Sequence, residues 1–245
     1  MSQYEESGAT LPGDQILAIS PIRQAIASRM QQSVTDIPRA WLMIEVDVTN
    51  LVALRQKLKE TFLLTEGFPL TISPFVIKGI VNALKEFPLM NASWTPEGIA
   101  VKRNIHISVA IGSEDEDAVI APVLRHADRK SIAGLAFELF DLLKRAKAGT
   151  LRPAEMQGDT FTFHNTGAFG SMLSYPIIQP QQAANLTFES IVRKPVVIQE
   201  MIAIRSMVSI CLSFDHRILD GMICGRFLQR VKHYLEKYDL ETLIY

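Results

Sequence analysis

Residues 207–221 read Met-Val-Ser-Ile-Cys-Leu-Ser-Phe-Asp-His-Arg-Ile-Leu-Asp-Gly, and the rest of the chain is organised around them. The run begins with an apolar segment that has the length of a buried strand and is too short for a buried helix. A helical pattern of apolar residues follows it. His216 therefore lies where a core strand ends and a helix begins, with two acids and an arginine nearby in sequence. Charges at the end of a buried strand are costly unless they are paired, and such places are where the pKa values of functional groups are shifted. This junction is therefore a candidate catalytic site. The alternative is an ion cluster that only caps the helix.

Helical spacing of apolar residues predicts five helices. They span residues 21–34, 50–66, 74–86, 131–148 and 222–235. Ser20 and Ser73 each precede a proline, the arrangement of an N-cap followed by Pro at the first helical position. Thr49 is expected to cap the second helix. The first helix is expected to bury Ile22, Ile26 and Met30, and the third is apolar on most sides, which indicates the centre of the core.

Alternating or continuous apolar runs predict six strands. They span residues 40–49, 105–111, 118–123, 160–165, 183–188 and 203–214. The acidic run at 112–117 is interpreted as a solvated hairpin tip, because a calcium loop requires alternating ligands and a glycine at a fixed offset. Together these elements predict one α/β domain over residues 14–245, a two-layer mixed β-sheet with helices packed on one face. Residues 1–13 are polar and rich in turn formers, so we expect a flexible arm or linker there.

Composition excludes several classes of function. Of the 245 residues, 48% are hydrophobic and 21% are charged, and the net charge of −1 indicates neither a nucleic-acid footprint nor a membrane-surface patch. Cys211 and Cys224 form no C-x-x-C pair or disulfide framework, and no signal peptide or transmembrane run is visible, so a reducing cytoplasm is expected. His106, His126 and His233 have no ligand-like spacing, so no metal site is expected.

A second stretch, residues 160–171, reads Thr-Phe-Thr-Phe-His-Asn-Thr-Gly-Ala-Phe-Gly-Ser. Here a strand ends in small residues and two glycines, a shape that lets the backbone approach a ligand closely. Alone, this pattern is more often a simple turn. The chain contains no Gly-x-Ser-x-Gly, which disfavours a serine hydrolase.

These stretches resemble the dihydrolipoyl acyltransferases, the core subunits of 2-oxoacid dehydrogenase complexes. Residues 215–221 match the family signature Asp-His-Arg-x-x-Asp-Gly, and residues 160–170 are similar to its Thr-Phe-Thr-x-Ser-Asn-x-Gly-x-x-Gly motif. Residues 176–184 resemble Pro-Ile-Ile-Asn-Pro-Pro-Gln-Ala-Ala, and residues 189–197 look most like the branched-chain type of Gram-positive bacteria. The resemblance runs from about Ile19 to the C-terminus and implies a fold like that of chloramphenicol acetyltransferase.

The resemblance implies that His216 is the general base for transfer of an acyl group between a dihydrolipoyl thioester and coenzyme A. The acyl group would be branched, for example isobutyryl or isovaleryl. An imidazole with an ordinary pKa of about 6.5 suits removal of a proton from a thiol with a pKa near about 8.5. Asp220 is expected to be a buried carboxylate beside the base, paired with Arg217, Arg23 or Arg29.

Stabilisation of the oxyanion is assigned to the segment around His164 and Asn165. The family usually has a small hydroxyl or amide side chain at the position of His164. Either the imidazole N–H donates in its place, or Asn165 or a backbone N–H does so. The second interpretation is favoured, because the imidazole is larger and its tautomer would have to be fixed.

The same resemblance assigns the coenzyme side of the site. The matching positions are Arg55, Thr71, Asn165, Thr166 and Ser190. A family acidic position falls on Gly112 and is not carried over. Coenzyme A is therefore expected as a substrate, with the lipoyl group carried on a separate domain.

The family is built from homotrimers with active sites between subunits, and its trimers assemble into cubic or dodecahedral cores. Members of the family also have a lipoyl domain and a peripheral-subunit-binding domain, and neither has a counterpart in this sequence. Those domains would bring lipoyl groups, the decarboxylase and dihydrolipoyl dehydrogenase. The chain is thus expected to be the catalytic core of a longer protein. The alternatives are a non-catalytic scaffold subunit and a stand-alone acetyltransferase of the same fold.

Overall fold

The computed structural model describes residues 13–112 and 119–245. The expected linker, apart from Gly13, and nearly all of the acidic hairpin tip lie outside the described residues. The helices are α1 (Pro21–Asp36), α2 (Thr49–Glu66), α3 (Ser73–Glu86), α4 (Ile132–Lys147) and α5 (Gly221–Glu236). The five expected helices are therefore confirmed, each within a few residues of its predicted ends.

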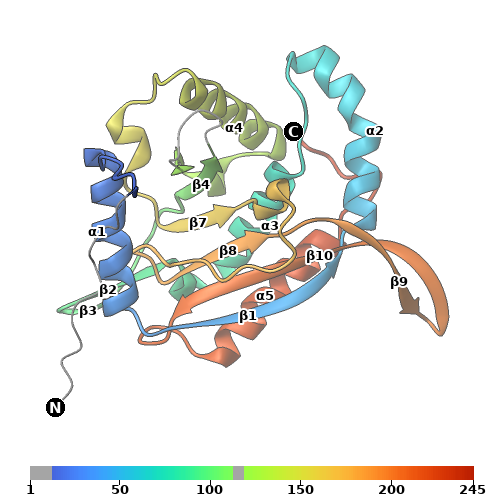
Figure 1. Ribbon diagram of the computed structural model, residues 1–245. Coiled ribbons are helices and arrows are strands. Elements are labelled where there is room, and N and C mark those ends of the chain that lie inside the picture. Colours follow the sequence, from blue (N-terminus) through green and yellow to red (C-terminus); the bar gives the residue numbers. More distant parts are fainter. Residues whose placement is uncertain (1–12, 113–118) are drawn as a thin grey trace.

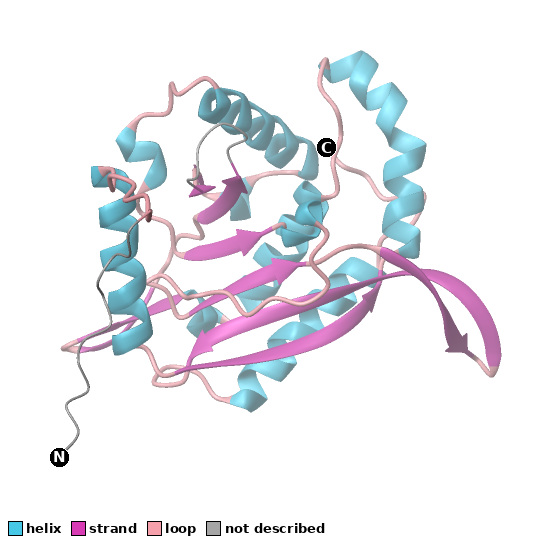
Figure 2. Ribbon diagram, in the orientation of Figure 1, coloured by secondary structure: helices cyan, strands magenta, loops and turns pink. Residues whose placement is uncertain are grey.

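The strands form one large mixed sheet and one small hairpin (Figures 1 and 2). They are β1 (Arg39–Asp47), β2 (Ala92–Thr95), β3 (Gly98–Val101), β4 (Ile107–Gly112), β5 (Val119–Ile120), β6 (Val123–Leu124), β7 (Phe161–His164), β8 (Ala184–Phe188), β9 (Val192–Ile198) and β10 (Met201–Asp215). The order in the large sheet is β1-β10-β8-β7-β4-β5, with β6 on β4 and β9 on β10. Only the β4–β7 and β7–β8 pairs are parallel among those described.

Three strands were missed by the sequence prediction, and one was divided differently. The segment expected at 118–123 forms two short pieces, β5 and β6, which pair separately with β4. The small hairpin β2–β3 and the strand β9 were not predicted. β9 contains Arg193, Lys194 and Pro195, and each of its residues is half-buried or exposed. Its sequence therefore shows no buried apolar face by which a strand could be recognised. It forms a strand because β10 continues beyond the sheet and pairs with it, giving the projecting hairpin in Figure 1.

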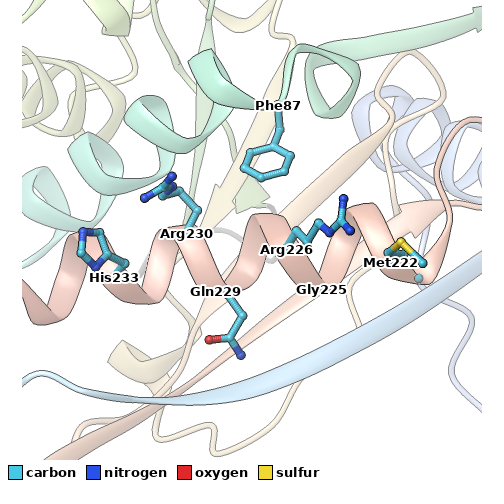
Figure 3. Close-up of a pocket in the computed structure, with 8 residues that line it drawn as sticks. Phe87, Met222, Gly225, Arg226, Gln229, Arg230 and His233 are labelled. Atoms are coloured by element: carbon cyan, nitrogen blue, oxygen red, sulfur yellow. The ribbon is translucent and has the colours of Figure 1, made fainter.

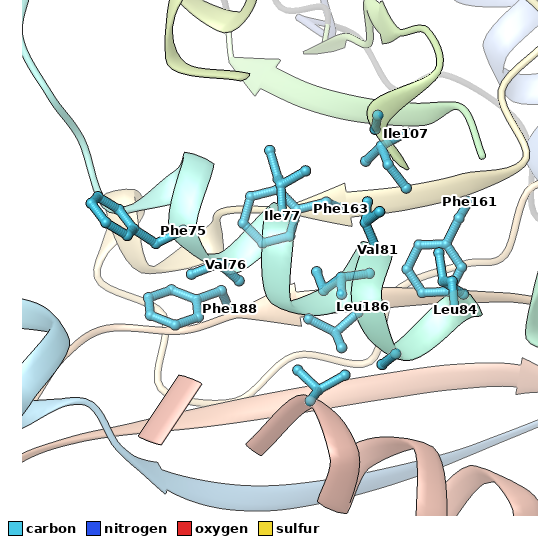
Figure 4. Close-up of a cluster of buried hydrophobic side chains, with 14 of the residues drawn as sticks. Phe75, Val76, Ile77, Val81, Leu84, Ile107, Phe161, Phe163, Leu186 and Phe188 are labelled. Carbon is cyan, nitrogen blue, oxygen red and sulfur yellow. The ribbon is translucent and has the colours of Figure 1, made fainter. Parts of the chain in front are cut away.

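One face of the sheet is apolar and carries the core. Figure 4 shows Phe161 and Phe163 of β7 and Leu186 of β8 packed against Val81 and Leu84 of α3. α3 is buried on most sides, as its sequence predicted. The helices α3 and α5 thus cover this face, and the two-layer α/β arrangement is confirmed.

The opposite face of the sheet is polar, and its polar groups are buried. The register aligns Ser108, Thr162, Asn185 and Ser213 across four neighbouring strands, and each is at most 2% exposed. The Ser108 and Thr162 hydroxyls are 2.9 Å apart, and Asn185 donates to the Ile177 carbonyl at 2.7 Å. The segment before β8 therefore covers this face through hydrogen bonds rather than through apolar packing.

α1 and two expected caps differ from the predictions. Ile26 and Met30 are only half-buried, because α1 lies beside polar segments and not in the apolar core. Ser20 caps α1 as expected, with its hydroxyl accepting from the Arg23 N–H. Thr49 and Ser73 are instead the first residues of their helices. Their hydroxyls accept from partners distant in sequence, the Ser206 backbone N–H and the Asn165 amide.

Candidate active site

The backbone of His216 is fixed from two sides. β10 ends at Asp215, whose N–H donates to the Ala183 carbonyl at 2.8 Å. The His216 N–H donates to the Pro38 carbonyl at 2.9 Å, just before β1 begins. The side chain itself is exposed, with its ring centroid 5.7 Å from that of Phe214. The imidazole is therefore held at the surface by a rigid strand end.

The arginine beside His216 serves a different acid from the one expected. Asp215 is 1% exposed, and its carboxylate accepts from Arg217 through Nη2 at 2.7 Å and Nε at 3.0 Å. The Arg217 guanidinium also lies 5.1 Å from the centroid of the Trp94 ring. The buried carboxylate raises the pKa of Arg217 through hydrogen bonding. A buried charge requires this bidentate partner far more than an exposed one does.

Asp220 is exposed in this chain, which contradicts the expected buried pair with an arginine. It is the N-cap of α5, and its Oδ1 accepts from the Ile223 N–H at 2.9 Å. In the described part of the chain, Asp220 forms no ion pair with Arg217, Arg23 or Arg29. The reason is local, since an acid directly before a helix satisfies free backbone N–H groups there.

His164 is the last residue of β7 and lies on the polar face. The residue is half-buried, and its Nε2 is enclosed with no hydrogen-bond partner among the described residues. Burial lowers the pKa of His164 to about 4, although the negative charge of Glu189 acts in the opposite direction. The ring is therefore neutral near pH 7.

The positions assigned to the coenzyme gather around the end of β7. Asn165 donates to the Ser73 hydroxyl at 3.4 Å, which ties the loop after β7 to the start of α3. Thr71 is exposed two residues before Ser73. Arg55 of α2 donates from Nε to the Leu70 carbonyl at 2.8 Å, so its guanidinium lies beside the same turn.

Thr166 and Ser190 join the same cluster from two sides. Thr166 donates to Glu189 at 2.8 Å, and Ser190 donates to the Gly167 carbonyl at 3.2 Å. Glu189 was not singled out from the sequence, because a lone glutamate after a strand resembles an ordinary surface residue. It is nevertheless 1% exposed. All five candidate coenzyme positions are thus brought together at one end of the sheet.

His216 lies at the opposite end of the sheet from this cluster. The register places His164 beside Thr187, and Thr187 opposite Cys211 on β10. From Cys211 the chain continues for five residues to His216, which is roughly 17 Å at about 3.3 Å per residue. Figure 1 shows why: β7 and β8 point one way and β10 points the other. One chain therefore carries two half-sites, the His216 half and the loop half, that do not meet.

Three grooves on the described surface do not include either half-site histidine. One of about 640 Å³ follows the outer side of α5, where Figure 3 shows Met222, Arg226 and Arg230 with Phe87 opposite. A second, of about 860 Å³, lies between α1 and the polar face. The third lies near Asn91. Neither His216 nor His164 lines any of these three grooves.

The described part of the chain shows neither a metal-binding cluster nor a helix suited to span a membrane. Among the described residues, no group of three or more histidine, cysteine, aspartate or glutamate side chains is arranged to hold a metal ion. Within the same residues, no helix has the length and apolar character needed to span a membrane.

The architecture is that of a known group of acyltransferases. Chloramphenicol acetyltransferase superposes with a TM-score of 0.55 at 13% identity, covering 90% of this chain and 99% of that one, which confirms the expected fold. At the level of sequence, residues 12–243 match the model of the 2-oxoacid dehydrogenases acyltransferase catalytic domain. The chain belongs to this family.

One curated relative is a component of a branched-chain alpha-keto acid dehydrogenase complex. The chain is 50% identical over 238 residues to the lipoamide acyltransferase component of the branched-chain alpha-keto acid dehydrogenase complex of Bacillus subtilis. The match covers 97% of this chain and 56% of that protein. The chain thus spans about half the length of the curated relatives it matches.

Solved structures of dihydrolipoamide acetyltransferases are also similar to this chain. A probable dihydrolipoamide acetyltransferase from Listeria monocytogenes has a TM-score of 0.93 and 47% identity, covering 96% of this chain and all of that one. Two others have a TM-score of 0.87 and 29% identity, covering 91% of this chain and 92% of theirs. One is the Azotobacter vinelandii dihydrolipoamide acetyltransferase, studied for the catalytic roles of a serine, a histidine and an asparagine. The other is the cubic core of the pyruvate dehydrogenase multienzyme complex.

The lowered pKa of His164 predicts how stability changes with pH. An unfolded histidine titrates near about 6.5, so as pH falls from there to about 4 the unfolded state binds a proton that the folded state does not. Between pH 7 and pH 5 the wild type should lose about 2 kcal/mol more unfolding free energy than His164→Ser. Denaturant unfolding at both pH values, at one protein concentration, measures the difference. Equal losses in the two proteins would contradict a neutral, enclosed imidazole.

Proposed function

We propose that this chain is the catalytic core of a dihydrolipoyl acyltransferase, transferring an acyl group between a dihydrolipoyl thioester and coenzyme A. The observation that carries the proposal is the position of His216 at a rigid strand end, within the family signature. The Azotobacter study names a serine, a histidine 52 positions later and an asparagine four positions further on. His164, His216 and Asp220 have these same spacings.

His216 is assigned the role of general base. Its exposed imidazole accepts the proton of the attacking thiol and returns it to the departing thiolate, which leaves the residue unchanged after each transfer. Asp215 and Arg217 neutralise each other beside it, so the strand end carries no uncompensated buried charge. Asp220 matches the asparagine of the Azotobacter enzyme in spacing, and we assign it a supporting role for the base.

Asn165 is the better candidate for the oxyanion donor. The Nε2 of His164 is enclosed, so the ring can meet a substrate only through its other edge. Asn165 is half-exposed and has a second amide hydrogen beyond the one donated to Ser73. A donor placed where negative charge develops contributes most when it is already oriented before the reaction.

The cluster around the loop fits one end of coenzyme A. Arg55 offers a cation, while Thr71, Thr166 and Ser190 offer small polar groups near the start of α3. Phosphate and amide groups are recognised by such side chains. These residues would hold the coenzyme on the loop half of the site.

A complete site then requires two chains. The two half-sites of one chain lie at opposite ends of the sheet, so the His216 of one subunit is proposed to face the loop of another. This supports a homotrimer, which in the family builds a cubic or dodecahedral core, and a cubic core is among the similar structures. The lipoyl domains, decarboxylase and dihydrolipoyl dehydrogenase are the proposed partners.

The branched-chain substrate rests on the Bacillus subtilis relative. Acyl transfer to free dihydrolipoamide, compared for isobutyryl-, acetyl- and succinyl-coenzyme A, tests it. Both cysteines are free and buried, which suits the cytoplasm proposed for the complex. A scaffold subunit without activity is the second candidate, favoured by the unusual His164.

Replacement of the base is the first test of activity. His216→Ala should lower turnover by at least about 100-fold and leave the fold intact, because only the proton acceptor is lost. His233→Ala, an exposed histidine on α5, is the matched control and should retain wild-type turnover. More than a tenth of wild-type turnover in His216→Ala would remove His216 as the base.

The oxyanion donor is decided by two variants. Asn165→Ala should lower kcat by roughly 100-fold, since a preoriented donor is removed. His164→Ser should be neutral or more active, because a serine is closer in size to the family's usual side chains. A large loss in His164→Ser with little change in Asn165→Ala would assign the donor to His164 instead.

Complementation tests the shared site directly. A mixture of His216→Ala chains and Asn165→Ala chains, dissociated and reassembled together, should recover activity at about a quarter of the sites, those that pair one intact His216 with one intact loop. Each variant assembled alone is the control and should stay inactive. If both half-sites served the same chain, the mixture would be as inactive as its components.

A further inference from the structure

Glu189 is a buried carboxylate that the proposed chemistry does not use. It follows β8 directly, is 1% exposed and, in the described part of the chain, forms no ion pair with a lysine or arginine. An unpaired buried charge is expensive and is retained only where other groups satisfy it. Its surroundings therefore indicate a specific role.

Hydroxyl groups satisfy this carboxylate from two different parts of the fold. Oε1 accepts from Thr187 of β8 at 2.6 Å. Oε2 accepts from Thr166 at 2.8 Å and from Ser174 at 3.2 Å, both on the loop after β7. The Ser171 hydroxyl lies 3.0 Å from that of Ser174 and extends the chain of hydroxyls. One oxygen is thus held by the sheet and the other by the loop.

The hydrogen bonds keep Glu189 ionised. Burial acts to raise its pKa, but hydrogen bonds from the surrounding hydroxyl groups outweigh burial and hold the pKa below its ordinary value. Hydrogen bonds to a charged acceptor are roughly twice as strong as those between neutral groups. The link between sheet and loop is therefore stronger than the same geometry would give with a neutral side chain.

The backbone at Glu189 fits closely against the same loop. A Cβ atom on Gly167 would lie 2.3 Å from the Glu189 carbonyl oxygen, so only glycine allows this approach. The Ser190 N–H donates to the Ser171 carbonyl at 2.8 Å, and the Ser190 hydroxyl donates to the Gly167 carbonyl. Main-chain and side-chain contacts thus fix the loop at one point, residues 189–190.

We propose that Glu189 is a positioning residue that holds the loop 165–174 in the conformation needed on the coenzyme side of the active site. The inference rests on the proposed function for its catalytic readout. The loop carries Asn165 and Thr166, so a shift of its anchor moves both the oxyanion donor and the coenzyme contacts. Displacement of such groups by about 1 Å costs on the order of 100-fold in rate.

Glu189 also determines what Thr166 presents to a ligand. A threonine hydroxyl has one hydrogen, and here that hydrogen is donated to the carboxylate. Toward the coenzyme, the Thr166 oxygen therefore acts as an acceptor. It suits an amide N–H, such as those of the pantetheine arm, and not a phosphate oxygen.

The test removes the charge while keeping the shape. In the assembled protein, Glu189→Gln should raise KM for the acyl-coenzyme A substrate by about 10- to 100-fold and lower kcat as well, because the loop that carries the coenzyme contacts and Asn165 loses its anchor. KM for dihydrolipoamide should stay within about twofold, because Glu189 anchors only the loop that carries the coenzyme positions. Amide hydrogen exchange over residues 165–175, measured without substrate, should become faster.

Two other variants separate positioning from general stability. Ser174→Ala removes one loop-side donor and should accelerate exchange in the loop, with a smaller rise in KM for the acyl-coenzyme A. Thr162→Val removes a hydroxyl that is 2% exposed on the polar face of the sheet and is bonded to Gln182, not to Glu189. It should lower thermal stability and leave both loop exchange and KM at wild-type values.

Each outcome has a distinct meaning. An assembled Glu189→Gln protein with wild-type loop exchange and wild-type KM would overturn the proposal. The same follows if Thr162→Val accelerates loop exchange as much as Ser174→Ala does. Should the wild type show no acyl transfer, the proposed function fails, while the exchange measurements still test whether Glu189 holds the loop.

Discussion

The direction of β10 is the constraint on which the rest of the structure depends. β10 runs antiparallel to β8, while β7 and β8 run parallel to each other. The carboxyl ends of β7 and β10 therefore emerge at opposite ends of one sheet, and they carry His164 and His216 respectively. No change of side-chain rotamer brings His216 to His164, because the backbone separation exceeds the reach of both rings. The proposal of a two-chain site follows from strand direction.

The polar face of the sheet shows how the fold accommodates this arrangement. A sheet buried by helices on one side commonly leaves the other side to water. Here that side is closed by the segment before β8 and by buried hydroxyl and amide groups. Two buried carboxylates are satisfied differently, Asp215 by Arg217 and Glu189 by hydroxyls. The ion pair lies directly beside His216 in the chain, and the hydroxyl groups connect Glu189 to the loop after β7.

Patterns that depend on local chemistry were predictable from the sequence. The apolar runs located β7, β8 and β10, and Ser20 capped α1 as expected. The failures arose where a distant partner decided the outcome. The Thr49 hydroxyl accepts from Ser206, and Arg217 pairs with Asp215 instead of Asp220. Neither choice is visible in sequence spacing, because each depends on which groups tertiary packing buries. The gathering of the coenzyme positions was implied by family resemblance and not by any local pattern.

Assembly and catalysis are physically linked in such a site. His216 is exposed in the isolated chain, and a base open to water acts in a high dielectric, where charges in a transition state are poorly stabilised. A second subunit that supplies the loop would also exclude water from the imidazole. In the proposed two-chain site, the same contact would therefore bring the donor, complete the coenzyme contacts and lower the local dielectric. All three depend on one interface. A substitution that weakens this interface should therefore lower turnover by a larger factor than it lowers the folding equilibrium constant of either half-site alone.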